Sequence, residues 1–204
     1  MKKVPLLWML ASLWMLAASQ PKFETVKQAY FKSYDYEQMG KYAEAIKVLT
    51  PLYKKYANGY TLNLRFGWLF FREKKYQDSL SYYQKASIIS PYAINPRLGI
   101  IRVYLQTEAY KKAESAAQEL LKIDYYNYYA NLYMIKALVA EKKFDAALQM
   151  VNKMLAVYPS SVPFLEQLAH IYKATGNKYL QKVYEDILIL DPNNVMVRSM
   201  QKVK

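Results

Sequence analysis

The chain has 204 residues, of which 53% are hydrophobic and only five are glycine, so a disordered or linker-rich polypeptide is excluded. It contains no cysteine and one histidine, which excludes disulfides, thiol catalysis and zinc sites built from those residues. Five scattered glycines cannot form a phosphate-binding loop. We therefore expect no metal, no cofactor and no enzymatic activity. The net charge of +13 favours a negatively charged neighbour.

Residues 1–19 have the pattern of a secretory signal peptide. Two lysines precede an apolar run over residues 4–18, and the small residues Ala17 and Ser19 allow cleavage before Gln20. This predicts an exported protein, periplasmic or secreted, with residues 20–25 as an N-terminal extension. The alternative is an uncleaved membrane anchor formed by residues 4–18. That run is shorter than the about 20 apolar residues that a spanning helix needs, which favours cleavage.

Beyond residue 25 the sequence repeats with a period of 34 residues. Aromatic residues recur at this interval, and a column of small residues follows three positions later. Self-similarity at such a period indicates a solenoid of stacked units. The two columns are Tyr42, Tyr76, Tyr110 and Phe144, and Ala45, Ser79, Ala113 and Ala147.

Within each period the apolar spacing is helical. In residues 60–93, Phe66 and Phe70 lie on one face of a first helix, and Tyr83 and Ala86 lie on one face of a second. A polar corner at residues 73–75 separates them, and Pro91 ends the second helix because proline cannot continue it. The fold class that follows is all-α, built from helix–turn–helix units that bury their apolar faces on their neighbours.

This pattern resembles the tetratricopeptide repeat family, whose units are 34-residue helix–turn–helix pairs. Units are expected at residues 26–59, 60–93, 94–127, 128–161 and 162–194, the last one residue shorter near Gly176. Residues 195–204 are similar to the short helix that caps such arrays, with a frayed tail as the alternative. An incomplete cap would leave apolar surface for self-association. The resemblance implies a right-handed superhelical solenoid that binds a partner protein or peptide in its concave groove.

The resemblance also places one stripe of each first helix on the concave surface. The side chains expected to bind the partner are Tyr30, Tyr34, Leu64, Trp68, Phe71, Arg72, Leu98, Arg102, Lys136 and His170. Members of that family that bind an acidic chain terminus share a clamp of lysine, asparagine and arginine side chains. Here Tyr30, Tyr34 and Arg65 stand where its lysine and two asparagines would be sought, so that ligand class is not expected. An apolar floor with a basic far end favours an amphipathic or extended partner segment.

Three groups of residues can each be interpreted in more than one way. The paired lysines near the expected turns are either solvated charges or an attraction for anionic glycans and lipids of the envelope, whereas export argues against nucleic acid. His170 has no second histidine or cysteine beside it, which favours a structural histidine over a metal ligand. The tyrosines at 125, 126, 128 and 129 either stack on a ligand or fill an irregular turn.

Overall fold

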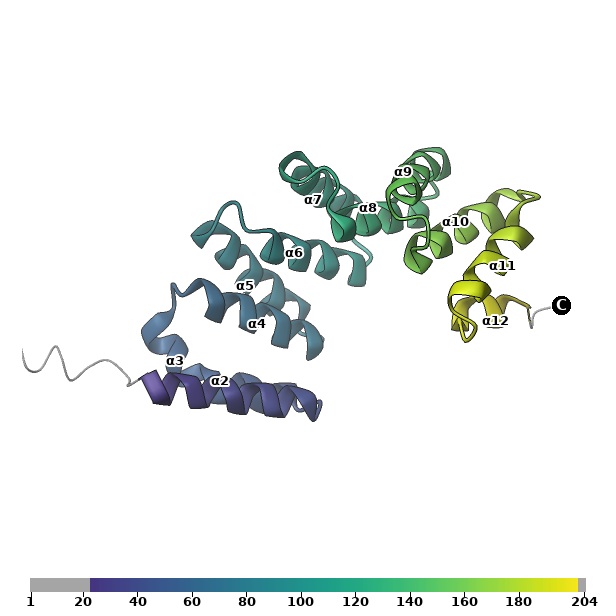
Figure 1. Cartoon of the computed structure of the whole chain (residues 1–204). Coiled ribbons are helices and arrows are strands. Elements are labelled where there is room, and N and C mark those ends of the chain that lie inside the picture. The colour runs from purple at the N-terminus through teal and green to yellow at the C-terminus, as the bar shows by residue number, and fades with distance from the viewer. Residues whose placement is uncertain (1–22, 202–204) are drawn as a thin grey trace, which may run out of the picture. The chain divides into compact units, whose positions relative to one another are not determined.

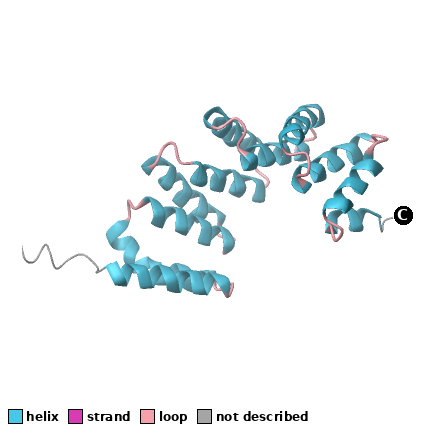
Figure 2. Ribbon diagram, viewed as in Figure 1, coloured by secondary structure: helices cyan, strands magenta, loops and turns pink. Residues whose placement is uncertain are grey.

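The computed structural model of the chain describes residues 23–201, and over that range it consists of α-helices joined by short loops (Figures 1 and 2). The predicted signal peptide, part of the N-terminal extension and residues 202–204 lie outside the described residues. None of the described helices is long and apolar enough to span a bilayer. The helices are α2 (Phe23–Gln38), α3 (Tyr42–Tyr56), α4 (Tyr60–Arg72), α5 (Tyr76–Ile89), α6 (Ile94–Gln106), α7 (Tyr110–Ile123), α8 (Tyr128–Ala140), α9 (Phe144–Val157), α10 (Val162–Thr175), α11 (Leu180–Leu190) and α12 (Val195–Gln201).

The helices form successive antiparallel pairs, which confirms the predicted all-α, helix–turn–helix fold class. The chain divides into two compact units, one ending at Ala57 and the other beginning at Asn58. The first unit contains the pair α2 and α3, whereas the second contains α4 to α12. The sequence period had placed all five predicted units, residues 26–194, in one array. No change in composition marks the boundary, which falls in the short loop before α4.

The column of small residues explains how closely the paired helices approach. Ala45, Ser79, Ala113 and Ala147 are all completely buried. In the second pair the Ser79 hydroxyl donates a hydrogen bond of 2.7 Å to the Gly67 carbonyl of the facing helix. Small side chains at these positions let the helix backbones come together, and a larger residue would separate them.

The turn within each pair has a repeated backbone conformation. A residue with positive φ occurs every 34 residues, and this conformation favours glycine. Glycine occupies the position in the first and fifth pairs, but the other three pairs have a side chain there. The φ angles are 72° at Gly40, 61° at Lys74, 56° at Glu108, 59° at Lys142 and 66° at Gly176.

The fifth pair is one residue shorter than the others, and the missing residue lies after this turn. Helix α11 begins at Leu180, four residues beyond Gly176, whereas α5 begins two residues beyond Lys74. The Asn177 side chain accepts a hydrogen bond from the Tyr179 backbone N–H at 2.9 Å and closes the gap. An asparagine turn therefore replaces the first turn of helix at this place.

The C-terminal segment is helical as far as Gln201. The Asn194 side chain accepts a hydrogen bond from the Val197 backbone N–H and so caps the start of α12. Val197 is completely buried and joins the apolar core formed with α8 to α11. Arg198 donates to the Pro192 carbonyl at 2.9 Å, as Arg97 in α6 does to the Pro91 carbonyl at 2.6 Å. Helix α12 thus repeats contacts made by the first helix of an earlier pair.

Candidate functional site

The first helices of the second unit, α4, α6, α8 and α10, contact one another in chain order. Residues at the same register of these four helices can therefore form a continuous surface. The candidate binding residues from Leu64 to His170 all lie on them. Tyr30 and Tyr34 lie on α2, in the first unit, so the site described here begins at α4.

Four side chains on α4, α6 and α8 form a group that we call the aromatic–arginine cluster: Trp68, Phe71, Arg102 and Tyr133. The Trp68 and Phe71 rings stack with centroids 6.0 Å apart and an interplanar angle of 21°. The Arg102 guanidinium carbon lies 5.2 Å from the Trp68 ring centroid, 5.7 Å from that of Phe71 and 5.9 Å from that of Tyr133. A cation held against three rings is stabilised by their negative faces.

Arg102 has its charge uncompensated by any carboxylate among the described residues. Its Nε donates to the Tyr133 hydroxyl at 3.3 Å, which leaves the two terminal nitrogens of the guanidinium without an acceptor in the described part of the chain. Arg72 also lies over Trp68, with its guanidinium carbon 5.2 Å from the ring centroid. Two cations thus border one tryptophan. The cluster is suited to an acidic or electron-rich group on the ligand.

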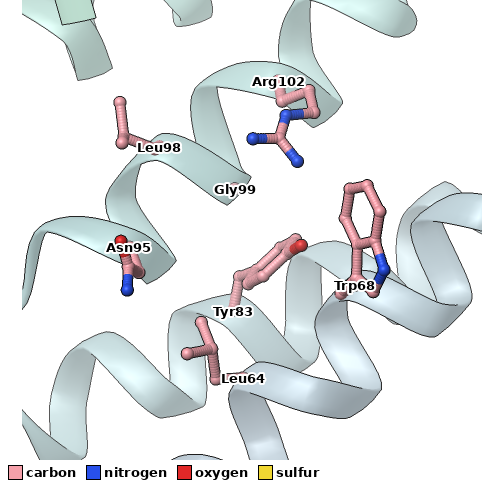
Figure 3. Close-up of a pocket in the computed structure, with 7 residues that line it drawn as sticks. All are labelled: Leu64, Trp68, Tyr83, Asn95, Leu98, Gly99 and Arg102. Carbon is pink, nitrogen blue, oxygen red and sulfur yellow. The ribbon is translucent and has the colours of Figure 1, made fainter. Parts of the chain in front are cut away.

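A pocket of about 190 Å³ opens beside this cluster, and we call it the Tyr83 pocket (Figure 3). Tyr83, from the second helix α5, rises through the pocket between the first helices α4 and α6, and its hydroxyl points toward Arg102 and Trp68. The pocket is lined by Leu64, Trp68, Tyr83, Asn95, Leu98, Gly99 and Arg102.

Two glycines make room for the Tyr83 ring. A Cβ atom built on Gly67 would lie 2.6 Å from Tyr83 Cδ1, and one built on Gly99 would lie 2.5 Å from Tyr83 Cζ. The ring is only 3% exposed. Burial raises the pKa of Tyr83 above 10.0, although the nearby Arg102 charge opposes the shift. The hydroxyl therefore keeps its proton near neutral pH and can act as a hydrogen-bond donor.

Comparison with known proteins identifies the repeat. The tetratricopeptide repeat family model matches residues 32–94. A tetratricopeptide repeat protein from Parabacteroides merdae superimposes with a TM-score of 0.75 at 20% identity, covering 86% of this chain and 70% of that one. MamA from Desulfovibrio magneticus superimposes with a TM-score of 0.73 at 14% identity, covering 84% of this chain and 97% of that one. No sequence among curated proteins matches.

This chain has the fold of a tetratricopeptide repeat protein. A third similar structure, YrrB, is described as a tetratricopeptide repeat protein with an unusual peptide-binding site. It superimposes with a TM-score of 0.66 at 12% identity, covering 86% of this chain and 91% of that one. At these identities the likeness shows the fold alone.

On this repeat fold the apolar floor of the predicted groove is narrower than expected. Leu98 is only 8% exposed because it packs into the core formed with α7 and α8. Trp68 and Phe71 are half-buried, with much of their surface covered by each other and by Arg102. What the surface offers is the edges and faces of a packed aromatic–arginine cluster, with Leu64 half-buried beside it.

The basic end of the stripe is present on α8 and α10. Lys136 is exposed and His170 is half-buried. Burial lowers the pKa of His170 below 6.5; Glu166 opposes this shift, and Lys173 and Lys136 add to it. Within residues 23–201 no three potential ligands among histidine and the acidic residues come together as a metal site. His170 therefore belongs to a cationic patch in which it is largely neutral near pH 7.

The tyrosines between the third and fourth repeats have structural partners. The Tyr128 ring lies 4.8 Å from that of Phe164, centroid to centroid, and its hydroxyl is 2.7 Å from the Ser161 hydroxyl. Lys153 lies over Tyr125, with Nζ 4.1 Å from the ring centroid, and donates to Asn131 Oδ1 at 2.7 Å. The turn-filling interpretation therefore accounts for Tyr128, and Tyr125 binds a lysine of the same chain.

Sequence reasoning missed two residues of the site. Tyr83 was assigned to helix packing, which is correct for its ring but leaves out its hydroxyl. Tyr133 precedes Met134 on α8 and was not included in the stripe, yet its hydroxyl orients Arg102. A usable signal for Tyr83 was the presence of glycine on both neighbouring first helices, at positions 67 and 99.

Proposed function

We propose that this protein is an exported, non-enzymatic scaffold that binds a segment of a partner protein along the first helices of its second unit. The observation that carries the proposal is Arg102, a cation stacked among three aromatic rings without a carboxylate among the described residues to neutralise it. Aromatic residues and arginine are the residue types that dominate protein interfaces. Such a cluster at the surface is suited to an anchoring contact.

Two further points support a protein ligand. The first helices α4, α6, α8 and α10 provide a continuous run of side chains, which suits an extended or helical segment better than a small molecule. YrrB, which has the same fold, is described as having a peptide-binding site. The predicted signal peptide supports export, so the partner is expected outside the cytoplasm.

Site-specific photo-crosslinking in the native host tests this proposal. A photoreactive phenylalanine analogue replaces Tyr133, in the cluster, or Tyr104, which lies on α6 and lines a different pocket with Lys112. We expect a discrete protein adduct from position 133 and none from position 104. The adduct from position 133 should become weaker in an Arg102→Gln background, because the substitution removes the cation that the partner is proposed to contact.

Two results would count against the scaffold. One is the absence of any adduct at position 133 in a chain whose circular dichroism shows that it is folded. The other is an equal yield of the same adduct from both positions, because that would indicate unspecific contact. Mass spectrometry of the purified chain from the same cells also shows whether the N-terminus is Gln20 or Met1.

The second candidate is a basic accessory protein that binds anionic glycans or lipids of the envelope. The observation in its favour is that Lys74 and Lys142 are exposed at corresponding turns of the second and fourth pairs. Binding by dispersed charges weakens steeply as salt rises, whereas a packed aromatic anchor is less affected. Retention on anionic vesicles that disappears above about 0.15 M salt, where the screening length is about 8 Å, would favour the accessory protein.

A further inference from the structure

The Tyr83 hydroxyl is a polar group at the end of a closely packed ring. The residue as a whole is only 3% exposed, and its O–H has no hydrogen-bond acceptor among the described residues, but the hydroxyl oxygen is not one of the fully buried polar atoms. Its hydrogen-bonding capacity is therefore open to a ligand that replaces water at this oxygen. This hydroxyl points into an open pocket (Figure 3) and not into the apolar core.

Its donor capacity is matched by a second donor on the same pocket. Arg102 lines the pocket, and its stacking on the aromatic rings uses the flat face of the guanidinium. Stacking leaves the N–H groups at the edge of the guanidinium free to donate, and Tyr133 accepts only from Nε. A hydroxyl donor and a forked cationic donor therefore converge on one space. The Asn95 side chain is exposed at the rim and can donate as well.

The space is large enough for a group of several atoms. Its volume of about 190 Å³ is far above the about 10–15 Å³ that a single water molecule requires. Leu64 and Leu98 provide an apolar wall, and the Trp68 ring forms another side. A ligand that fits has a short apolar stem and a planar, negatively charged head with two acceptor oxygens.

We infer that the Tyr83 pocket receives the side-chain carboxylate of an aspartate or glutamate in an extended segment of the partner, an inference that rests on the proposed scaffold function. The Tyr83 hydroxyl donates to one carboxylate oxygen, and the Arg102 guanidinium donates to the carboxylate from its edge. The methylene groups of the acidic side chain lie against Trp68. The neighbouring residues of the segment continue over Phe71 and Tyr133.

A side-chain carboxylate is favoured over a chain terminus for two reasons. The cluster extends past the pocket onto α8 through Tyr133, so the surface does not stop where a terminus would end. The sequence also has tyrosine at positions 30 and 34 where a terminal clamp would have lysine and asparagine.

Binding of peptide pools by the full chain tests the assignment. Three pools of acetylated heptapeptides have mixtures of Leu, Phe, Ala and Ser at all positions except the centre. One has central Glu and an amidated end, one has central Gln and an amidated end, and one has central Gln and a free carboxyl end. Equilibrium dialysis with mass spectrometry measures the retained fraction. We expect the central-Glu pool to bind about tenfold more strongly than either central-Gln pool, because charge-assisted hydrogen bonds are the stronger kind.

Variants assign the preference to named groups. Tyr83→Phe keeps the ring between the two glycines and removes only the hydroxyl, and Arg102→Gln removes the cation. Each should reduce the preference for Glu over Gln several-fold. The matched control is Tyr104→Phe with Lys112→Gln, because Lys112 Nζ lies 6.0 Å over the Tyr104 ring outside this pocket. The two control substitutions also remove one tyrosine hydroxyl and one positive charge, but outside the pocket. They should keep the wild-type preference for Glu over Gln.

The possible failures are distinguishable. Equal binding of both amidated pools would leave a peptide-binding surface but overturn the carboxylate pocket. Preference for the pool with a free carboxyl end would assign the pocket to a chain terminus. Absence of binding by every pool would contradict peptide capture at this surface altogether. A Tyr83→Phe chain that is less stable than the wild type would show that the hydroxyl has an internal structural partner, and would also overturn the inference.

Discussion

The second and fourth helix pairs, α4/α5 and α8/α9, have the same register but fill the space between their helices differently. In the second pair this space holds Gly67, the Tyr83 ring and, from the next first helix, Gly99. The positions 68 residues later, twice the period, are Ile135, Val151 and Gln167, all buried. One pair takes its bulk from the second helix and the other from the first helices.

This difference decides which pair has a pocket. A tyrosine rising from the second helix carries a hydroxyl out to the surface of the first helices, where it meets Arg102. Val151 and Ile135 are both completely buried in the core that α8 to α11 share. Two pairs with the same register can therefore differ at the surface, since only the residue at position 83 brings a polar group to the first helices. The following predictions test how far the two solutions are independent.

The largest effect is expected in the fourth pair. Ile135→Ala removes a completely buried side chain from the core shared by α8 to α11, so it should lower the free energy of unfolding by about 2–5 kcal/mol. Urea denaturation followed by circular dichroism measures the loss. The aromatic–arginine cluster lies outside the volume that is vacated, so peptide binding should be retained at temperatures where the variant is folded. A loss below about 1 kcal/mol would mean that the neighbours collapse into the space.

The second pair should be destabilised by the opposite kind of change, which is an increase in side-chain volume. Gly67→Ala places a Cβ atom 2.6 Å from Tyr83 Cδ1, and the near end of that ring cannot move away. We expect a loss of about 1–3 kcal/mol from overpacking, even though alanine favours helix over glycine.

A double-mutant cycle sharpens this prediction. With Tyr83→Val, which gives the second helix the residue found at position 151, the same Gly67→Ala substitution should become neutral or stabilising by up to about 1 kcal/mol. Both single variants and the double variant are compared by denaturant unfolding. If Gly67→Ala costs the same with and without the tyrosine ring, the two glycines serve another purpose.

Much of the fold could be predicted from the sequence because it depends on columns at one period. The aromatic and small residues at 42, 45 and their equivalents set the helix pairs, and Pro91 marks the end of one of them. The site depends instead on a triad drawn from three different columns. Gly67 and Gly99 are 32 residues apart, so a comparison at intervals of 34 never places them together. The Tyr83 pocket was therefore not visible in the repeat pattern.

Two other features lacked a local signal. The burial of Leu98 results from packing against α7 and α8, which a helical stripe on α6 alone does not reveal. The positive φ at Lys74, Glu108 and Lys142 is imposed by the pair geometry, since these residue types do not favour it. In the sequence, only Gly40 and Gly176, which occupy the same position of the 34-residue period, indicated this conformation.

That turn conformation gives a smaller prediction, in which the two pairs should behave alike. Lys74→Gly and Lys142→Gly each relieve a left-handed backbone conformation that costs roughly 1–2 kcal/mol for a residue with a side chain. The greater flexibility of glycine when unfolded offsets roughly 0.5–1 kcal/mol of this gain. We expect each variant to be more stable by about 0.5–1 kcal/mol, seen as a higher midpoint of thermal unfolding. Unequal gains would show that the two pairs differ in their turns as well as in their cores. Gln84→Gly, at an exposed position inside α5, should be destabilising by about 0.5–1 kcal/mol and is the control.

The smallest effect concerns alkaline pH, where only the second pair has an ionisable group at the central position. Burial raises the pKa of the Tyr83 hydroxyl above 10.0, so the folded chain holds this proton more tightly than the unfolded chain does. The stability that results is fully present below pH 10 and is lost as the pH rises through the pKa of the folded state. Tyr83→Phe should therefore reduce the decline in unfolding free energy above pH 10, without changing its pH dependence between 6 and 9.

Val151→Ala, at the equivalent position of the fourth pair, is the control. It lowers the unfolding free energy at every pH but removes no titrating group, so its unfolding free energy should decline above pH 10 as steeply as that of the wild type. Urea denaturation at a series of pH values measures the three slopes. A Tyr83→Phe slope equal to that of Val151→Ala would mean that the hydroxyl is hydrated as freely in the folded chain as in the unfolded one. The pocket would then lack the partly desolvated donor that is proposed to recognise a carboxylate.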